Sequence, residues 1–90
     1  MDYQILRSID IEGENCQYQL ILRSIVDENN FQHFQTIIYI PSTNDIIFQT
    51  PPKYNWIESK HIYSYTLKNI GKYIKITPRQ AYLAIKKNAK

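Results

Sequence analysis

Few residues of this chain could supply acid–base, nucleophilic or metal chemistry. The histidines are His33 and His61, and neither has a partner at the short spacing that is typical of a metal site. Cys16 lies beside a predicted turn, so we interpret it as a small apolar residue at the end of a strand. Gly13 and Gly71 are isolated, whereas a phosphate-binding loop needs several glycines close together. The sequence therefore predicts no catalytic site, no metal and no cofactor.

The charged residues are distributed unevenly along the chain. Residues 1–50 contain two basic and seven acidic residues, a net charge of −5. Residues 51–90 contain nine basic residues and one acid, a net charge of +8. A basic half of this kind favours an acidic partner, of which nucleic acid is the commonest. The alternative is a small protein that has one acidic and one basic end without a partner that uses them.

The first segments that must position these charges have the pattern of a β-hairpin. The pentapeptide ILRSI occurs at residues 5–9 and again at 21–25, within stretches whose Ile, Leu and Tyr residues are typical of strands. The polar, glycine-containing segment 12–15 between them predicts a turn that brings Ile5 opposite Leu22. Because hairpin strands are antiparallel, we interpret the two copies as similar strands and not as equivalent halves of one site.

Two further hairpins are predicted from the same kind of pattern. Residues 34–40 and 46–50 are apolar strands separated by a Pro-Ser-Thr-Asn-Asp segment that is dense in turn-forming residues. Residues 61–67 and 72–77 alternate in polarity, and a turn with Gly71 in the left-handed region would connect them.

The last element predicted is a helix over residues 78–88. Thr77 is a good N-cap, Pro78 suits the first helical position, and Gln80 completes a Thr-x-x-Gln capping box. We expect an α+β domain over residues 1–90, with about six antiparallel strands in a meander and a C-terminal helix. The residues of the helix that we expect to face the sheet are Ala81, Tyr82, Ile85 and Ala89.

Tyrosines are interleaved with lysines in the basic half. In the third predicted hairpin, Tyr63, Tyr65 and Tyr73 share one face, and isoleucines occupy the other, which we assign to the core. Exposed rings beside cations can stack on bases while the cations contact phosphates. The predicted nucleic-acid-binding residues are Tyr63, Tyr65, Lys68, Lys72, Tyr73, Lys75, Arg79, Lys86, Lys87 and Lys90. The alternative is that the tyrosine face is core, beneath the helix or against another subunit.

The leading hypothesis is thus a small non-enzymatic module that binds nucleic acid. A second hypothesis is a protein-interaction module that binds an acidic protein surface, such as an inhibitor or adaptor of phage, mobile-element or toxin–antitoxin type. A homodimer that sets the basic half of one chain against the acidic half of another belongs to the same class. A small metal-independent ribonuclease toxin is the third, because Lys, Tyr and His can all transfer protons. Without a long apolar run or a signal-peptide pattern, we expect a cytoplasmic protein with no membrane segment.

Overall fold

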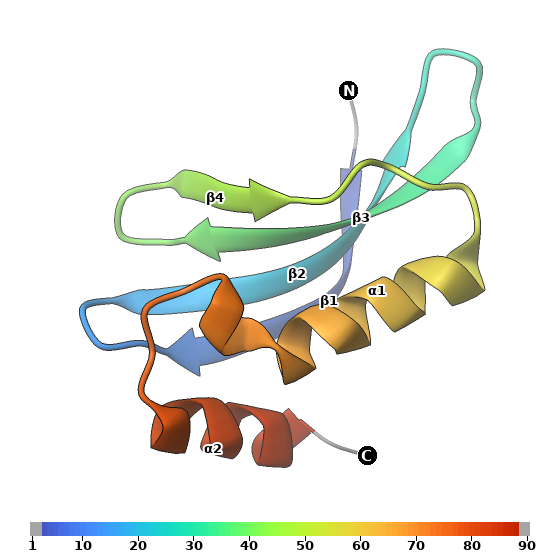
Figure 1. Ribbon diagram of the computed structural model, residues 1–90. Helices are drawn as coiled ribbons and strands as arrows, with labels where there is room; N and C mark the ends of the chain where they lie inside the picture. Colours follow the sequence, from blue (N-terminus) through green and yellow to red (C-terminus); the bar gives the residue numbers. More distant parts are fainter. Residues whose placement is uncertain (1–2, 89–90) are drawn as a thin grey trace.

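The computed structural model describes residues 3–88 and shows an antiparallel sheet followed by two helices (Figure 1). The sheet has the strand order β1-β2-β3-β4, so each strand is joined to its neighbour by a hairpin. The α+β class is confirmed, but the expectation of about six strands is wrong, because the sheet contains four. The elements are β1 (Tyr3–Glu12), β2 (Gln17–Val26), β3 (Gln32–Ile40), β4 (Asp45–Gln49), α1 (Trp56–Lys68), the 3-10 turn η1 (Ile70–Lys72) and α2 (Pro78–Asn88).

The first hairpin forms, but its register differs from the expected one. A β-bulge at Leu6 separates two parts of the β1–β2 ladder, so that Ile5 lies opposite Arg23 while Arg7 lies opposite Leu22. A bulge adds one residue to one strand and reverses the alternation beyond it. The expected pairing of Ile5 with Leu22 is therefore wrong.

The two arginines of the repeated pentapeptide point to opposite sides of the sheet. Leu22 belongs to the buried core beneath the helices, and its partner Arg7 lies on that side. Arg23 lies on the other side, where its guanidinium is 5.0 Å from the centre of the Tyr3 ring. The interpretation of the copies as two similar strands, and not as equivalent halves of a site, agrees with this arrangement.

The turn between β1 and β2 needs a glycine for space. The backbone N–H of Gly13 donates a 3.0 Å hydrogen bond to the carbonyl of Cys16, and Gly13 does not have a positive φ. A Cβ at this position would collide with the ring of Tyr18, which is itself buried in the core. The hairpin turn at residues 41–44 instead uses Asn44 at φ 61°, a conformation that asparagine tolerates better than most residues.

The third predicted hairpin is wrong. Residues 61–67 form most of α1, residues 70–72 form η1, and Gly71 is not in the left-handed region. The alternation of residues 61–67 is compatible with a strand, but a helix places its buried side chains on one stripe: Ser59, Tyr63, Thr66 and Leu67. Packing of this stripe against β2 and β3 overrides the strand propensity of the Ile and Tyr residues.

Local signals also support α1. Its N-cap Asn55 accepts a 2.9 Å hydrogen bond from the backbone N–H of Glu58, and Glu58 adds negative charge to the first turn. The hydroxyls of Ser59 and Thr66 donate to the carbonyls four residues earlier, at 2.7 and 2.8 Å. These bonds satisfy polar groups that would otherwise be buried without partners.

The second helix has the predicted bounds, and its capping box is present. The backbone N–H of Thr77 donates to Gln80 Oε1, and the N–H of Gln80 donates to Thr77 Oγ1, both at 3.1 Å. The expected sheet-facing stripe is only partly right, because Tyr82 is 60% exposed and Ala84 is the buried residue. Ala89 lies outside the described residues.

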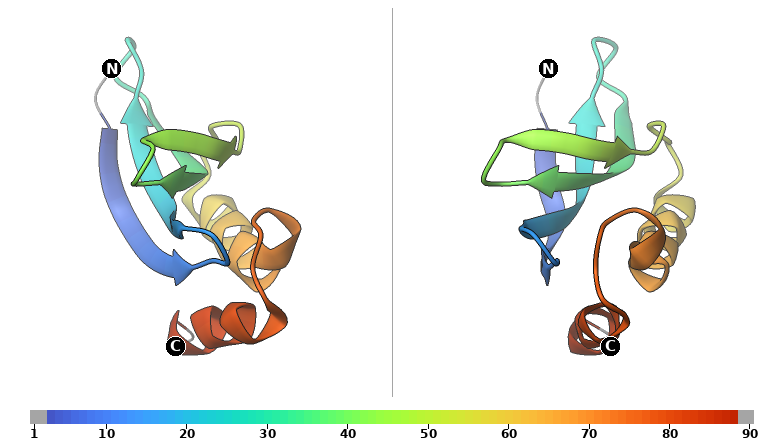
Figure 2. Two further views of the ribbon diagram at one scale, coloured as in Figure 1. Left: turned by 90° about the vertical axis from the view of Figure 1, so that its left-hand side faces the viewer. Right: turned by 60° about the vertical axis from the view of Figure 1, so that its left-hand side comes forward.

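Both helices lie on one side of the sheet (Figure 2). α1 packs on β2 and β3, whereas α2 packs on β1 and η1. We call the other side of the sheet the open face, because none of the helices in residues 3–88 covers it. The core beneath the helices consists of Ile11, Tyr18, Leu20, Leu22, Ile38, Tyr63, Leu67, Ile70, Ile74 and Ala84.

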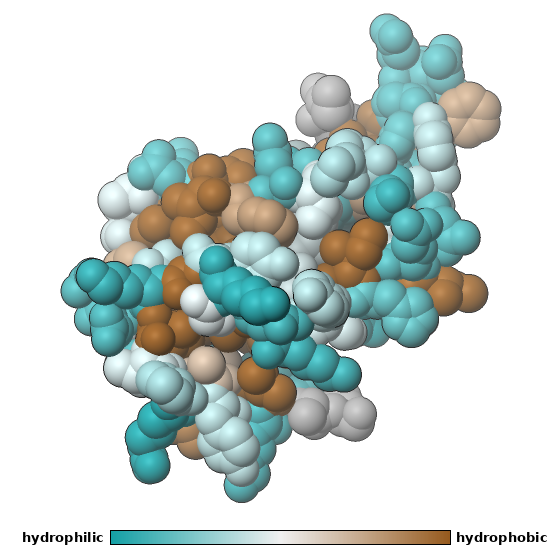
Figure 3. Space-filling model, viewed as in Figure 1, coloured by the Kyte–Doolittle hydropathy of each residue, from teal (hydrophilic) through white to brown (hydrophobic). Residues whose placement is uncertain are grey.

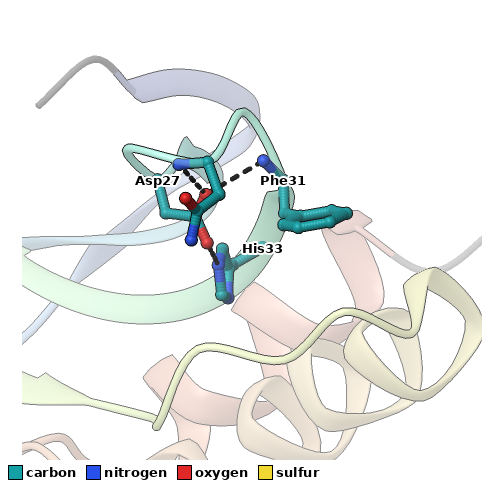
Figure 4. A network of polar contacts seen from close by, with 4 residues as sticks. Asp27, Phe31 and His33 are labelled. Carbon is teal, nitrogen blue, oxygen red and sulfur yellow. Dashed lines mark hydrogen bonds and ion pairs between the residues drawn. The ribbon is translucent and has the colours of Figure 1, made fainter.

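The loop between β2 and β3 is held by one carboxylate (Figure 4). Asp27 accepts hydrogen bonds from the backbone N–H groups of Asn29 (2.9 Å) and Phe31 (3.0 Å) and lies 2.8 Å from His33 Nε2. The hydrogen bond from His33, followed by that from Phe31, lowers the pKa of Asp27 below its usual value. This network fixes the sharp turn in which Asn30 has φ 68°.

Candidate nucleic-acid interface

A groove of about 820 Å³ lies between β1, α1 and α2, within the range of about 300–1,000 Å³ that is common for ligand sites. Positively charged side chains reach it from all three elements: Arg7 from β1, Lys68 from the end of α1, and Lys87 from the last turn of α2. We call it the basic groove. The remaining residues that line it are Ser8, Ile9, Tyr63, Ser64, Leu67, Ile85 and Asn88.

Each of the three cations is positioned by its secondary structure. Arg7 is the first residue after the bulge in β1, and its pairing with Leu22 fixes it on the side of the sheet that faces the helices. Lys68 and Lys87 lie in the last turns of their helices, where a positive charge also interacts favourably with the helix dipole. The dipole is a structural reason for these two lysines, but it does not explain why their helices converge on Arg7.

The floor of the basic groove is apolar and fixed. Tyr63 is 2% exposed, and its hydroxyl donates a 2.9 Å hydrogen bond to the carbonyl of Leu20. Burial raises the pKa of Tyr63 well above its usual value, although the nearby positive charge of Arg7 acts in the opposite direction. The hydroxyl therefore stays protonated and belongs to the core, and the groove does not use it as a reactive group.

The side chains of the groove provide binding chemistry. They offer three positive charges, the hydroxyl of Ser64 and the amide of Asn88, and the groove lining contains no carboxylate or imidazole. Within residues 3–88, an ion pair joins Lys53 to Glu58 (3.2 Å), and Asp27 lies 2.8 Å from His33 Nε2, so neither contact involves a cation of the groove. The same part of the chain contains no cluster of His, Cys, Asp or Glu that could hold a metal ion. An anion with apolar parts is the chemical match.

The structure brings only some of the predicted binding residues together. Lys68 and Lys87 meet in the basic groove. Tyr63 reaches the same place as part of its floor, so the expectation that it is exposed for stacking is wrong. Tyr73 is half-buried and packs on Phe48, with ring centres 4.6 Å apart, so part of its ring is already covered.

The other predicted residues lie on exposed surface outside the groove lining. Tyr65 is 57% exposed and lies on another face of α1 from Tyr63. The exposed cations that do not line the groove are Lys72, Lys75, Arg79 and Lys86. Lys90 lies outside the described residues. The common tyrosine face of a hairpin does not exist, because its residues belong to a helix and a loop.

Sequence reasoning missed four polar residues that line the groove: Arg7, Ser8, Ser64 and Asn88. Arg7 belongs to the acidic half, and only the fold brings it to the two lysines. A signal for it was available, since Arg7 is one of only two basic residues among the first fifty.

Comparisons of the chain with protein families, with curated proteins and with solved structures find no match. Among the described residues, neither helix is long and apolar enough to cross a membrane.

Proposed function

We propose that this protein binds single-stranded nucleic acid in the basic groove. The observation that carries the proposal is the convergence of Arg7, Lys68 and Lys87, from three separate elements, on a groove without a carboxylate in its lining. Cations that meet at one place attract phosphates, and the serine and asparagine side chains can donate further hydrogen bonds to them.

The apolar floor favours a single strand over a duplex. Ile9, Leu67 and Ile85 can contact an unstacked base or a sugar, whereas a duplex presents its phosphates outside and keeps its bases stacked. Two exposed tyrosines add stacking surface on the helices: Tyr65 on α1, and Tyr82 on α2, whose ring centre is 5.9 Å from Lys86 Nζ. These replace Tyr63 and Tyr73 as the aromatic residues of the proposal.

The test is a fluorescence anisotropy titration of a single-stranded oligonucleotide and its duplex at several salt concentrations. The variant replaces Arg7, Lys68 and Lys87 by alanine. Each lost phosphate contact should reduce the salt slope by roughly 0.7, so three losses should weaken binding by roughly 100-fold at about 0.1 M salt.

The matched control replaces Lys72, Lys75 and Arg79 by alanine, which removes the same charge from surface that does not line the groove. We expect this control to keep most of the salt slope. Equal losses in both variants would indicate diffuse attraction and contradict a groove site. Absence of binding at low salt, or equal binding of polyglutamate, would favour the acidic protein partner. Shortening of the oligonucleotide in a gel assay would favour the ribonuclease alternative.

A further inference from the structure

No helix in residues 3–88 covers the open face of the sheet, whose side chains are both apolar and polar. A hollow of about 340 Å³ lies on it, and the floor is formed by Ile21 and Ile37, which are only 5% and 4% exposed. The side chains around them are more exposed, with Tyr3 at 61% and Ile5 at 51%. Ile46 and Ile47 of β4 are 46% and 44% exposed, and Figure 3, which is viewed from the side of the helices, shows apolar surface over β4. An uncovered apolar face is typical of an interaction site.

The open face is large enough for a small protein interface. At usual strand spacings the paired part of the sheet has a footprint of roughly 600 Å². Two such faces together bury about 1,200 Å², the lower limit of a standard protein interface.

The open face carries one positive and one negative side chain on opposite sides of a central row, so two copies of the face can be complementary to each other. The central row across the sheet contains Ser8, Ile21, Ile37 and Gln49. On β2, Arg23 lies two residues after Ile21 and therefore on one side of this row. Asp10 lies on the other side, opposite Gln19, whose side chain donates to it at 3.0 Å.

We propose that the open face binds a second copy of the same chain, with the twofold axis along the central row. Rotation about this axis sets the central rows of the two copies face to face and brings the exposed Tyr3 and Ile5 of each copy against the partner. It also places Arg23 of each copy beside Asp10 of the other. The arrangement is isologous, so it closes as a dimer and contains the Arg–Asp pair twice.

Arg23 is prepared for such a contact. Its Nε donates a 3.0 Å hydrogen bond to Gln35 Oε1, and its guanidinium lies over the Tyr3 ring, so the side chain is held in place. The terminal nitrogens carry no further hydrogen bond among the described residues. An arginine that is already ordered loses little conformational freedom on binding.

The experiment is sedimentation velocity of the full chain between about 1 and 500 µM, a range that covers weak interfaces. The wild type should approach twice 10.8 kDa as the concentration rises. Arg23→Glu or Asp10→Arg alone places like charges together and should raise the dimer dissociation constant by at least roughly tenfold. The double variant reverses both charges and should recover most of the wild-type affinity.

Two controls separate this proposal from general effects. Arg79→Glu makes the same charge change on α2, on the helical side, and should leave dimerisation unchanged. Circular dichroism and the unfolding midpoint check that each variant is folded, and exposed Asp10 provides a test even if Arg23→Glu fails to fold. A wild type that stays monomeric overturns the proposal. So do a dimer insensitive to the single changes and a double variant as weak as the singles.

Discussion

The buried hydroxyl of Tyr63 gives the sharpest test of the fold, because the same residue would be exposed in a hairpin. Tyr63→Phe keeps the ring and removes the hydrogen bond to the Leu20 carbonyl. The net loss for one such bond is about 1 kcal/mol. For 90 residues the entropy of unfolding is about 190 cal/mol/K, so the unfolding midpoint should fall by about 5 °C.

The matched control for this change is Tyr65→Phe on the same helix. Tyr65 is 57% exposed, and loss of an exposed hydroxyl should change stability by less than about 0.5 kcal/mol. Thermal unfolding followed by circular dichroism measures both variants. Equal midpoints for Tyr63→Phe and the wild type would refute the buried hydrogen bond and, with it, the packing of α1 on β2.

The pH dependence of the stability of the wild type and of Tyr63→Phe provides a second test. Burial raises the pKa of Tyr63 in the folded state above its unfolded value near 10. Folding is then favoured while the hydroxyl is protonated, and this contribution is lost as the pH rises above about 10. Wild-type stability should therefore decrease more steeply in alkaline solution than that of Tyr63→Phe. Parallel curves for the two proteins would contradict the burial of this hydroxyl.

The remaining predictions concern a helix end and a loop. Thr77→Ala should lower the free energy of unfolding by about 1 kcal/mol, because the capping box loses its hydroxyl. Chemical denaturation measures this change, and Thr43→Ala in an exposed turn is the control. Asp27→Asn should destabilise the protein at neutral pH, because the lowered pKa of Asp27 stabilises the fold while the carboxylate is charged. The difference from the wild type should disappear as the pH falls below about 4, and Glu28→Gln in the same loop should lack this pH dependence. A constant difference at all pH values would contradict a role for the charge.

Elements with strong local signals could be predicted from the sequence. The hairpin of β3 and β4 follows from a dense turn segment between two apolar strands, and α2 follows from Thr77, Pro78 and Gln80. α1 was missed because alternating Ile and Tyr residues satisfy a strand pattern locally. Two signals favour the helix: Asn55 as a cap, and a stripe from Trp56 through Tyr63 to Leu67. The stripe indicates a helix only when a sheet is present to bury it.

The candidate site was predictable only in part, for a related reason. Lys68 and Lys87 belong to the basic half and could be singled out by charge. Arg7 stood out only as one of the two basic residues among the first fifty, because its position beside the lysines depends on the packing of α2 on β1 and of α1 on the neighbouring strands. The tyrosines were misassigned together with the hairpin, since the number of residues between Tyr63 and Tyr65 places them on one face of a strand and on different faces of a helix.

The repeated pentapeptide finally explains how one small sheet can carry two different surfaces. Arg7 pairs with Leu22, so these two residues lie on the same side of the sheet. Arg23 follows Leu22 directly along β2, and it therefore lies on the opposite side from Arg7. Arg7 therefore faces the helices and contributes to the basic groove, whereas Arg23 contributes to the open face. Simple alternation would place Tyr3 and Ile5 on the side of Arg7, but the bulge at Leu6 turns them to the open face. The bulge thus adds two apolar residues to the proposed dimer face, and a dimer formed there leaves both basic grooves accessible on the outer sides.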